Sequence, residues 1–154
     1  MSIYMKVPFA QGDVTATGFI GWIELETLQF QVDRSLSMET SSTSNHPTSL
    51  PKFSLFTVTK KIEDSSGGLF EQAVKGMSGH DIEIAVVETG NAPKEYARYT
   101  LRDAYLSHYS VDASQAFLAE RVSFAYSYIQ AEYKPHNRQN TGASKITTMY
   151  ELNN

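Results

Sequence analysis

The sequence predicts a mainly β protein, an antiparallel β-barrel or sandwich with one short α-helix packed on its side. Most segments alternate apolar and polar residues with the period of a half-buried strand. Apolar residues recur at helical spacing in a single segment, which begins near residue 66. Strands and helices do not alternate as in parallel α/β folds. We therefore expect roughly seven to nine strands in a single domain that covers residues 1–154.

The composition excludes several classes of function. The chain is 41% hydrophobic and 19% charged, which indicates a globular protein. Its net charge of −4 and lack of a basic tract argue against nucleic acid as a partner. It has no cysteine, so disulfides, thiolate nucleophiles and zinc–thiolate sites are excluded. No apolar run approaches the roughly 20 residues that span a bilayer, so we expect no membrane insertion.

The first part of the chain predicts two or three strands and then a long loop. Residues 3–9 alternate and predict the first strand, and residues 19–32 predict one or two more, with Ile23 and Leu25 on one face. The stretch SLSMETSSTSNHPTSLP, residues 35–51, is rich in Ser and Thr and has no hydrophobic period. Loops this long inside a compact domain are usually functional or ordered by a partner.

The middle of the chain predicts a strand followed by the single helix. Residues 53–59 alternate. Asp64, Ser65 and Ser66 are favourable N-cap residues. The helix should run for about three turns and end near Gly76 and Gly79. Its expected apolar positions are Leu69, Phe70, Ala73, Val74 and Met77.

The last part of the chain predicts further antiparallel strands. Residues 81–88 and 96–101 predict a hairpin, residues 104–111 and 121–133 predict two longer strands, and the tail at 145–152 could add one more. Three stretches have apolar residues on both faces, at 53–58, 82–87 and 122–129. Burial of both faces would arise from oligomerisation through the sheet or from a sandwich with tight loops.

No pattern of residues indicates a catalytic, cofactor or metal site. The four histidines, His46, His80, His108 and His136, include no pair at metal-ligand spacing. The SSGG sequence before the helix lacks the Lys of a phosphate-binding loop, and no G-x-S-x-G nucleophile elbow occurs. We expect no enzymatic activity and no cofactor.

One aromatic pattern leaves a binding function open. Residues 123–133 contain Phe124, Tyr126, Tyr128 and Tyr133 on a β pattern. Aromatic side chains along a strand can stack on sugars, and they are also common in barrel cores and subunit interfaces. A monomeric carbohydrate-binding β-sandwich therefore remains an alternative function.

The order of the segments resembles the Hcp family, the hemolysin-coregulated proteins that form the inner tube of the type VI secretion system. The matching pieces are GWIELETLQF, VTKKIEDSSGGLFEQAVKG, DIEIAVVETGNAPKEYARYTLRDAYLSHYS and VSFAYSYIQAEYKP, which together span most of the chain. Two pieces depart from the family: the loop at 35–51 is not glycine-rich, and Met149-Tyr150 stands where a Gly-Trp pattern is usual.

The resemblance implies a phage tail-tube-like barrel with its helix at 64–77. Six subunits would form a ring, and rings would stack into a secreted tube that carries or chaperones effectors in its lumen. The implied partners are further copies of the chain, type VI effectors, the spike protein and the sheath. The protein would be cytoplasmic before assembly and then secreted without a cleaved signal peptide. A tail-tube protein of a phage-like contractile particle is the alternative.

The resemblance also implies two sets of contact residues. The extended loop would reach a neighbouring subunit or ring through Ser37, Met38, Glu39, Thr40, Ser41, Ser42, Thr43 and Ser44. The lumen-facing residues that contact effectors would be Ser110, Asp112, Ser114 and Gln115.

Overall fold

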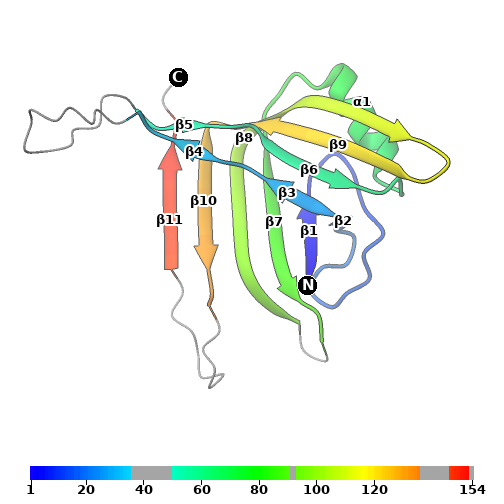
Figure 1. Cartoon of the computed structure of the whole chain (residues 1–154), viewed down its shortest axis with the longest axis horizontal. Coiled ribbons are helices and arrows are strands. Elements are labelled where there is room, and N and C mark those ends of the chain that lie inside the picture. Colours follow the sequence, from blue (N-terminus) through cyan, green and yellow to red (C-terminus); the bar gives the residue numbers. More distant parts are fainter. Residues whose placement is uncertain (36–49, 91–92, 136–145, 153–154) are drawn as a thin grey trace, which may run out of the picture.

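The computed structural model describes residues 1–35, 50–90, 93–135 and 146–152. Figure 1 shows two walls of strands that curl into an open barrel, with one helix at the side. In chain order the elements are β1 (Ser2–Lys6), β2 (Ile23–Leu25), β3 (Thr27–Gln29), β4 (Val32–Asp33), β5 (Lys52–Phe53), β6 (Phe56–Lys60), α1 (Ser66–Lys75), β7 (His80–Glu88), β8 (Lys94–Ala113), β9 (Leu118–Ala125), β10 (Tyr128–Tyr133) and β11 (Ile146–Glu151).

Strand β8 belongs to both walls of the barrel. The main sheet runs in the order β2-β1-β7-β8-β9-β6-β3, and β10 pairs with β8 on one side and β11 on the other. The first half of β8 pairs with β7 and β10, and its second half pairs with β9. One wall is therefore β2-β1-β7-β8-β10-β11 and the other is β8-β9-β6-β3. A strand that changes sheets in this way makes the corner of a barrel.

The corner of β8 lies at Asp103, whose φ of 51° is in the left-handed region. The strained backbone is supported locally, because the Asp103 carboxylate accepts a 3.0 Å hydrogen bond from the Ser127 hydroxyl. Gly79 provides the space for this side chain, since a Cβ at Gly79 would lie 2.0 Å from Asp103 Oδ1. The bend lets β8 turn from one wall into the other without ending.

The main core fills the space between the two walls. Alternate residues of every long strand point into it, including Met5, Ile84, Leu101 and Val122, all fully buried. Phe30 stacks on Phe56 of one wall with ring centroids 5.2 Å apart and meets Tyr99 of the other wall edge-on at 5.3 Å. This arrangement confirms the expected mainly β fold with a single helix.

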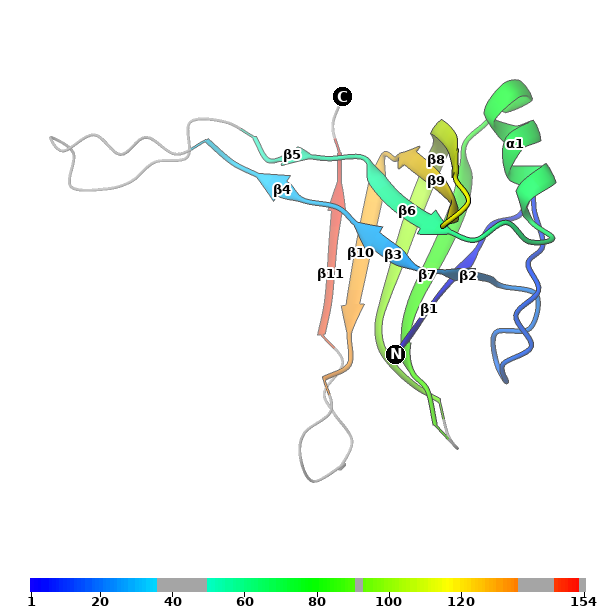
Figure 2. The ribbon, with the colours of Figure 1, turned by 45° about the vertical axis from the view of Figure 1, so that its right-hand side comes forward.

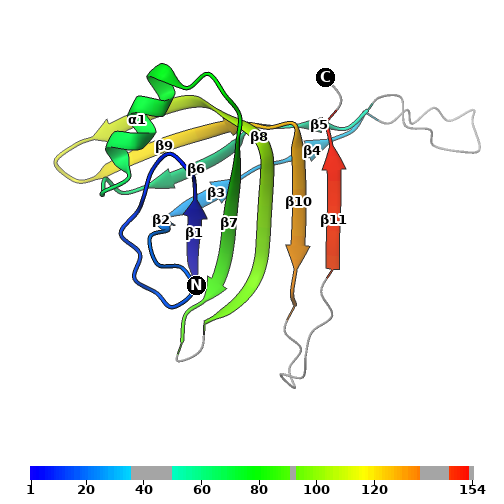
Figure 3. The same cartoon turned by 180° about the vertical axis from the view of Figure 1, so that it is seen from behind.

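A second, smaller core covers the other face of β1 and β7. Val14, Phe19 and Trp22, from the loop between β1 and β2, pack over Ala85 and Val87 of β7, which are fully buried. Figure 3 shows this loop beside β1 and β2, on the side away from β3 and β6. For β7, therefore, the two-sided burial expected from the sequence is produced by the chain's own loop.

The strand boundaries differ from the predicted ones for topological reasons. Residues 96–101 and 104–111 were expected to be separate strands, but both belong to β8 because the corner at Asp103 continues the pairing. Residues 121–133 were expected to be one strand, but the chain breaks into β9 and β10 as it changes partners. The described residues form eleven strands, since 19–32 also divides into short pieces where it crosses between the walls.

Candidate assembly surfaces

A buried ion cluster fixes the helix to the barrel. Lys60 Nζ lies 2.7 Å from Glu120 Oε1 and 3.3 Å from Glu63 Oε1, and the side chains of Lys60 and Glu120 are fully buried. The Ser66 hydroxyl donates a hydrogen bond to Glu120 Oε1, and the Tyr109 hydroxyl donates one to Glu120 Oε2. We call these five residues the buried ion cluster. Because Ser66 is the first residue of α1, the cluster links the helix to β6, β8 and β9.

The hydrogen bonds decide the charge state of this cluster. Burial alone raises the pKa of the Glu120 carboxyl, but the hydrogen bonds from Lys60, Ser66 and Tyr109 outweigh it and hold the pKa below its usual value. Burial, together with the hydrogen bond to Glu120, raises the pKa of Tyr109 to about 12. At neutral pH the cluster therefore holds an ionised carboxylate and a protonated tyrosine.

Sequence reasoning missed the buried ion cluster, although a signal was present. Phe56, Val58 and Lys60 occupy alternate positions of β6 and share its buried face. Glu120 occupies the corresponding position of β9, directly opposite Lys60 in the strand register. A charged residue that continues an apolar alternation is a candidate for a buried pair, but the partner becomes evident only when the two strands are aligned.

The helix presents an exposed apolar stripe. Of its five expected apolar positions, only Leu69 is buried, whereas Phe70, Val74 and Met77 are 57%, 66% and 92% exposed. Phe70 and Val74 follow i, i+4 spacing and so share one face of the helix, and Met77 lies two residues past its end. Phe70 packs on Tyr109 of β8, with ring centroids 5.6 Å apart. We call Phe70, Val74 and Met77 the α1 stripe.

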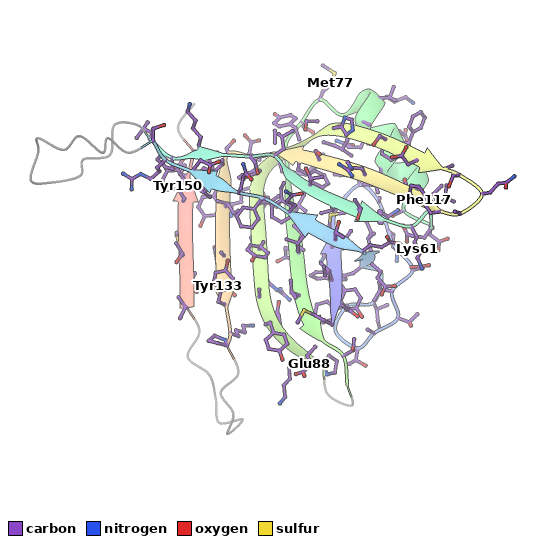
Figure 4. The ribbon with its side chains drawn as sticks, viewed as in Figure 1. Lys61, Met77, Glu88, Phe117, Tyr133 and Tyr150 are labelled. Carbon is purple, nitrogen blue, oxygen red and sulfur yellow. The ribbon has the colours of Figure 1, made fainter. Side chains whose placement is uncertain are left out.

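The α1 stripe remains exposed because the helix meets the barrel through its N-terminal turn. At Gly68 the helix backbone passes so close to the β1–β2 loop that a Cβ would lie 2.8 Å from the Phe9 carbonyl oxygen. Figure 4 shows Met77 beyond the far end of the helix and Phe117 at the tip of the β8–β9 hairpin, on the same side of the molecule. Phe117 is 55% exposed. Exposed apolar side chains that gather on one side of a molecule suggest a protein interface.

The opposite side of the molecule carries an open sheet edge and a projecting arm. All six residues of β11 are exposed, and within the described chain this strand pairs with β10 alone. Strands β4 and β5 form a separate two-stranded ribbon that projects beyond β11, as Figure 2 shows. We call the pair β4 and β5 the arm. An open edge of this type is a template for pairing with another chain.

The wall β8-β9-β6-β3 has a polar outer face. Across it Thr27, Thr59, Arg121 and Ser110 form one row of directly opposed residues. In a neighbouring row, the Thr57 and Ser123 hydroxyls lie 2.9 Å apart. We call this surface the polar wall. Its sequence signal is the alternation of Thr57 and Thr59 with buried residues in β6.

The structure brings the four expected lumen residues to one end of the polar wall. Ser110 and Asp112 lie on its outer face in the second half of β8, opposite Arg121 and Ala119. Ser114 and Gln115 are exposed in the β8–β9 turn. The Ser114 hydroxyl accepts hydrogen bonds from the backbone N–H groups of Ala116 and Phe117, so this side chain also shapes the turn.

The expected contact loop, residues 37–44, lies outside the residues that the structure describes. The described part of the arm shows where this segment joins the barrel. Val32 pairs with Phe53 and Asp33 pairs with Lys52, so the chain leaves through one strand of the arm and returns through the other.

The described residues form no cluster of three or more His, Asp or Glu side chains that could hold a metal ion. His80 packs its ring on Phe9 at 5.3 Å, and His108 lies in β8. His46 and His136 are outside the described residues. Over the same part of the chain, no helix is long and apolar enough to cross a membrane.

The four aromatics considered for sugar binding do not form one platform. Phe124 is fully buried in the main core, and Tyr126 packs against Phe53. Tyr128 is on the outer face of the other wall, where the Arg102 guanidinium lies 4.8 Å from its ring. Tyr133 is hydrogen-bonded to the Tyr99 hydroxyl at 3.1 Å. The aromatics lie on different faces because the strand breaks between β9 and β10, so the structure removes the observation behind the carbohydrate-binding alternative.

Comparison with known protein families gives one match that covers most of the chain. Residues 4–133 match the family described as "Type VI secretion system effector, Hcp". No curated protein sequence matches the chain.

Solved structures of the same kind share its fold. A structure described as a type six secretion system protein has a TM-score of 0.88 and 21% identity, and the match covers 98% of this chain and 95% of that one. Hcp1 from Salmonella typhimurium has a TM-score of 0.76 and 19% identity, covering 98% and 94%. The secreted protein Hcp3 from Pseudomonas aeruginosa has a TM-score of 0.68 and 13% identity, covering 99% of both chains.

Proposed function

Because the chain belongs to the Hcp family of type VI secretion proteins, we propose that it is a single-domain tube subunit that closes into hexameric rings. Stacked rings would form the secreted inner tube and carry effectors in the lumen. Hcp proteins are non-enzymatic structural proteins that the type VI system secretes. The proposal extends these family properties to the assembly of this particular chain.

The proposal rests on two surfaces that lie on opposite sides of the molecule: the α1 stripe, and the open edge of β11 together with the arm. Figures 1 and 2 place α1 on one side and β11 with the arm on the other. A surface that is complementary to a different surface of the next copy produces a head-to-tail contact, which closes into a ring when the rotation allows. Two like surfaces on one side would instead favour a dimer.

The chemistry of the two sides supports such a contact. The α1 stripe offers apolar side chains that gain by leaving water. The opposite side offers the edge of β11 that pairs with no other described strand, together with exposed apolar side chains such as Ile146 and Val32. In the ring, the β11 side of one subunit would cover the α1 side of the next.

The polar wall is the surface that best suits a water-filled channel. Its Ser and Thr hydroxyls bond partly to one another, so they offer cargo few strong contacts. We place Ser110, Asp112, Ser114 and Gln115 at the lumen end of this wall, where several weak contacts from six subunits would hold an effector by multivalency. Cargo could then be carried without being bound permanently by any one subunit.

The remaining parts of the proposal rest on the family. The loop that joins the strands of the arm would contact a neighbouring subunit or ring through Ser37, Met38, Glu39, Thr40, Ser41, Ser42, Thr43 and Ser44. Effectors, the spike protein and the sheath would be the other partners. The subunit would assemble in the cytoplasm and leave the cell without a cleaved signal peptide.

Light scattering coupled to size exclusion, with negative-stain imaging of the main peak, tests the ring. We expect six copies of the 17.2 kDa chain, a mass of about 100 kDa, and particles with a central hole. A monomer at high concentration, without rings after cross-linking, would refute the proposal.

A charge placed on the α1 stripe tests whether this surface forms the contact between subunits. Val74→Glu should shift the mass towards the monomer, because the added carboxylate would be desolvated in the contact. Thr89→Glu is the matched control, since it adds the same charge at an exposed position beyond the end of β7. Equal effects of the two substitutions would exclude the α1 stripe as the contact.

A further inference from the structure

The arm has little intrinsic stability. Each of its strands has two residues, and within the described chain β4 and β5 pair only with each other. Both residues of β4 are exposed. Because an isolated two-stranded ribbon is marginal in water, the direction of the arm must be set by contacts where it leaves the barrel.

Those contacts form an aromatic cluster from three distant segments. The Phe53 ring lies 5.1 Å from the ring of Tyr150 in β11 and 6.3 Å from the ring of Tyr126, between β9 and β10. The Tyr126 hydroxyl donates a 2.9 Å hydrogen bond to the carbonyl oxygen of Ser54, the residue after Phe53. We call Phe53, Tyr126 and Tyr150 the arm root.

The strand geometry places Tyr150 and its neighbour Met149 on opposite faces of β11. Tyr150 lies opposite Ile129, a nearly buried residue, on the inner face of β11. Met149 lies opposite Gln130, on the outer face, because successive side chains of a strand alternate. Figure 4 shows Tyr150 where the arm joins the barrel. Among the labelled side chains of that view, it alone lies at this junction.

From this geometry we propose that Tyr150 is a positioning residue, through which the C-terminal strand sets the direction of the arm. It acts by packing against Phe53, while Tyr126 holds the backbone at Ser54. Tyr150 belongs to neither core and is 36% exposed, so it controls where the arm points rather than whether the chain folds. Where the proposed function holds, it also controls ring stacking through the arm.

The direction of the arm can be measured with two spin labels. The chain has no cysteine, so Asp33→Cys on the arm and Ser107→Cys on exposed β8 give the only labelling sites. Labelled protein diluted into an excess of unlabelled protein reports the distance within one subunit. We expect a narrow distance distribution in the parent protein and in Tyr150→Phe, which keeps the ring.

Tyr150→Ala should broaden the distribution, and Phe53→Leu should do the same from the other side of the contact. Met149→Ala is the matched control on the same strand and should leave the distribution narrow. An unchanged distribution in Tyr150→Ala would overturn the proposal. Equal broadening in Met149→Ala would also overturn it, because the effect would then come from β11 as a whole.

Ring stacking provides the second readout. Tyr150→Ala should form rings as the parent does, while the protein concentration needed for tubes rises about fivefold or more, as the loss of one aromatic contact per arm implies. The two proposals fail separately. If the parent forms no rings, the proposed function is wrong and the spin-label distances still decide the role of Tyr150.

Discussion

The buried ion cluster and the arm root both join segments that are distant in the chain, but they do so with different chemistry. The ion cluster holds Lys60 and the ionised Glu120 fully buried, 2.7 Å apart. The arm root is partly exposed and relies on tilted and edge-on ring contacts and one hydrogen bond. The first stabilises the fold and the second directs a projecting segment. This difference follows from burial, because an unpaired charge costs much more free energy inside a protein than at its surface.

The largest expected effect comes from removing one partner of the buried pair. Lys60→Met should lower the free energy of unfolding by about 3–5 kcal/mol, because it leaves the Glu120 carboxylate buried without its cation. The double variant Lys60→Met with Glu120→Leu should recover much of this loss, since both charges are then removed. Urea unfolding at one fixed protein concentration measures both variants, because assembly also contributes to stability.

The exposed pair Lys75–Glu71 is the control for that prediction. Its atoms are 3.6 Å apart with both side chains about 70% exposed. Glu71→Gln should change the free energy of unfolding by less than about 1 kcal/mol. If it cost as much as Lys60→Met, burial would not be what distinguishes the two pairs.

The two faces of α1 sharpen the same contrast. Leu69→Ala should lower the free energy of unfolding by about 2–5 kcal/mol, since Leu69 is fully buried in the main core. Val74→Ala, on the α1 stripe, should have little effect on the unfolding of an isolated subunit and should weaken ring formation. Urea unfolding and light scattering together separate the two outcomes. A stripe substitution that unfolds the subunit would contradict the assignment.

Acid should weaken the buried ion cluster. The pKa of Glu120 is lower in the folded chain than its ordinary value of 4.5, so the unfolded chain binds the proton first as pH falls. The stabilisation is present above pH 4.5 and is lost as pH falls from there towards the lower folded pKa. The difference in stability between the parent and Glu120→Gln should therefore shrink below about pH 4.5. A difference that stays constant down to pH 3 would show that Glu120 does not titrate in this way.

A small effect is expected in the arm root, well below that of Lys60→Met. Tyr126→Phe removes the hydrogen bond to the Ser54 carbonyl and keeps the ring, which should cost about 1 kcal/mol. Burial raises the pKa of Tyr126 to about 12, so its contribution should be lost as pH rises from 10 towards 12. Urea unfolding at pH 8 and pH 11 compares the parent with Tyr126→Phe, and the difference should be smaller at the higher pH. A loss as large as that of Lys60→Met would break the contrast between the two regions.

Much of the fold could be predicted from the sequence because its signals are local. Alternation in β6 and β7 and the helical spacing after Ser66 reflect which side chains share a face, a property of neighbouring residues. The order of segments, such as GWIELETLQF before the helix, led to the Hcp family, and the family match confirms it. The exposure of Val74 and Met77 could not be predicted, because helical spacing identifies an apolar face without saying what covers it.

Local patterns and the order of segments therefore suffice for the mainly β class, the helix and the family. That Lys60 faces Glu120, that Thr27 and Ser110 lie in one row of the polar wall, and that Tyr150 packs on Phe53 become evident only in the folded chain. These contacts depend on strand register. A shift of one residue between two paired strands moves every side chain to the other face, and no local pattern specifies the register between distant segments.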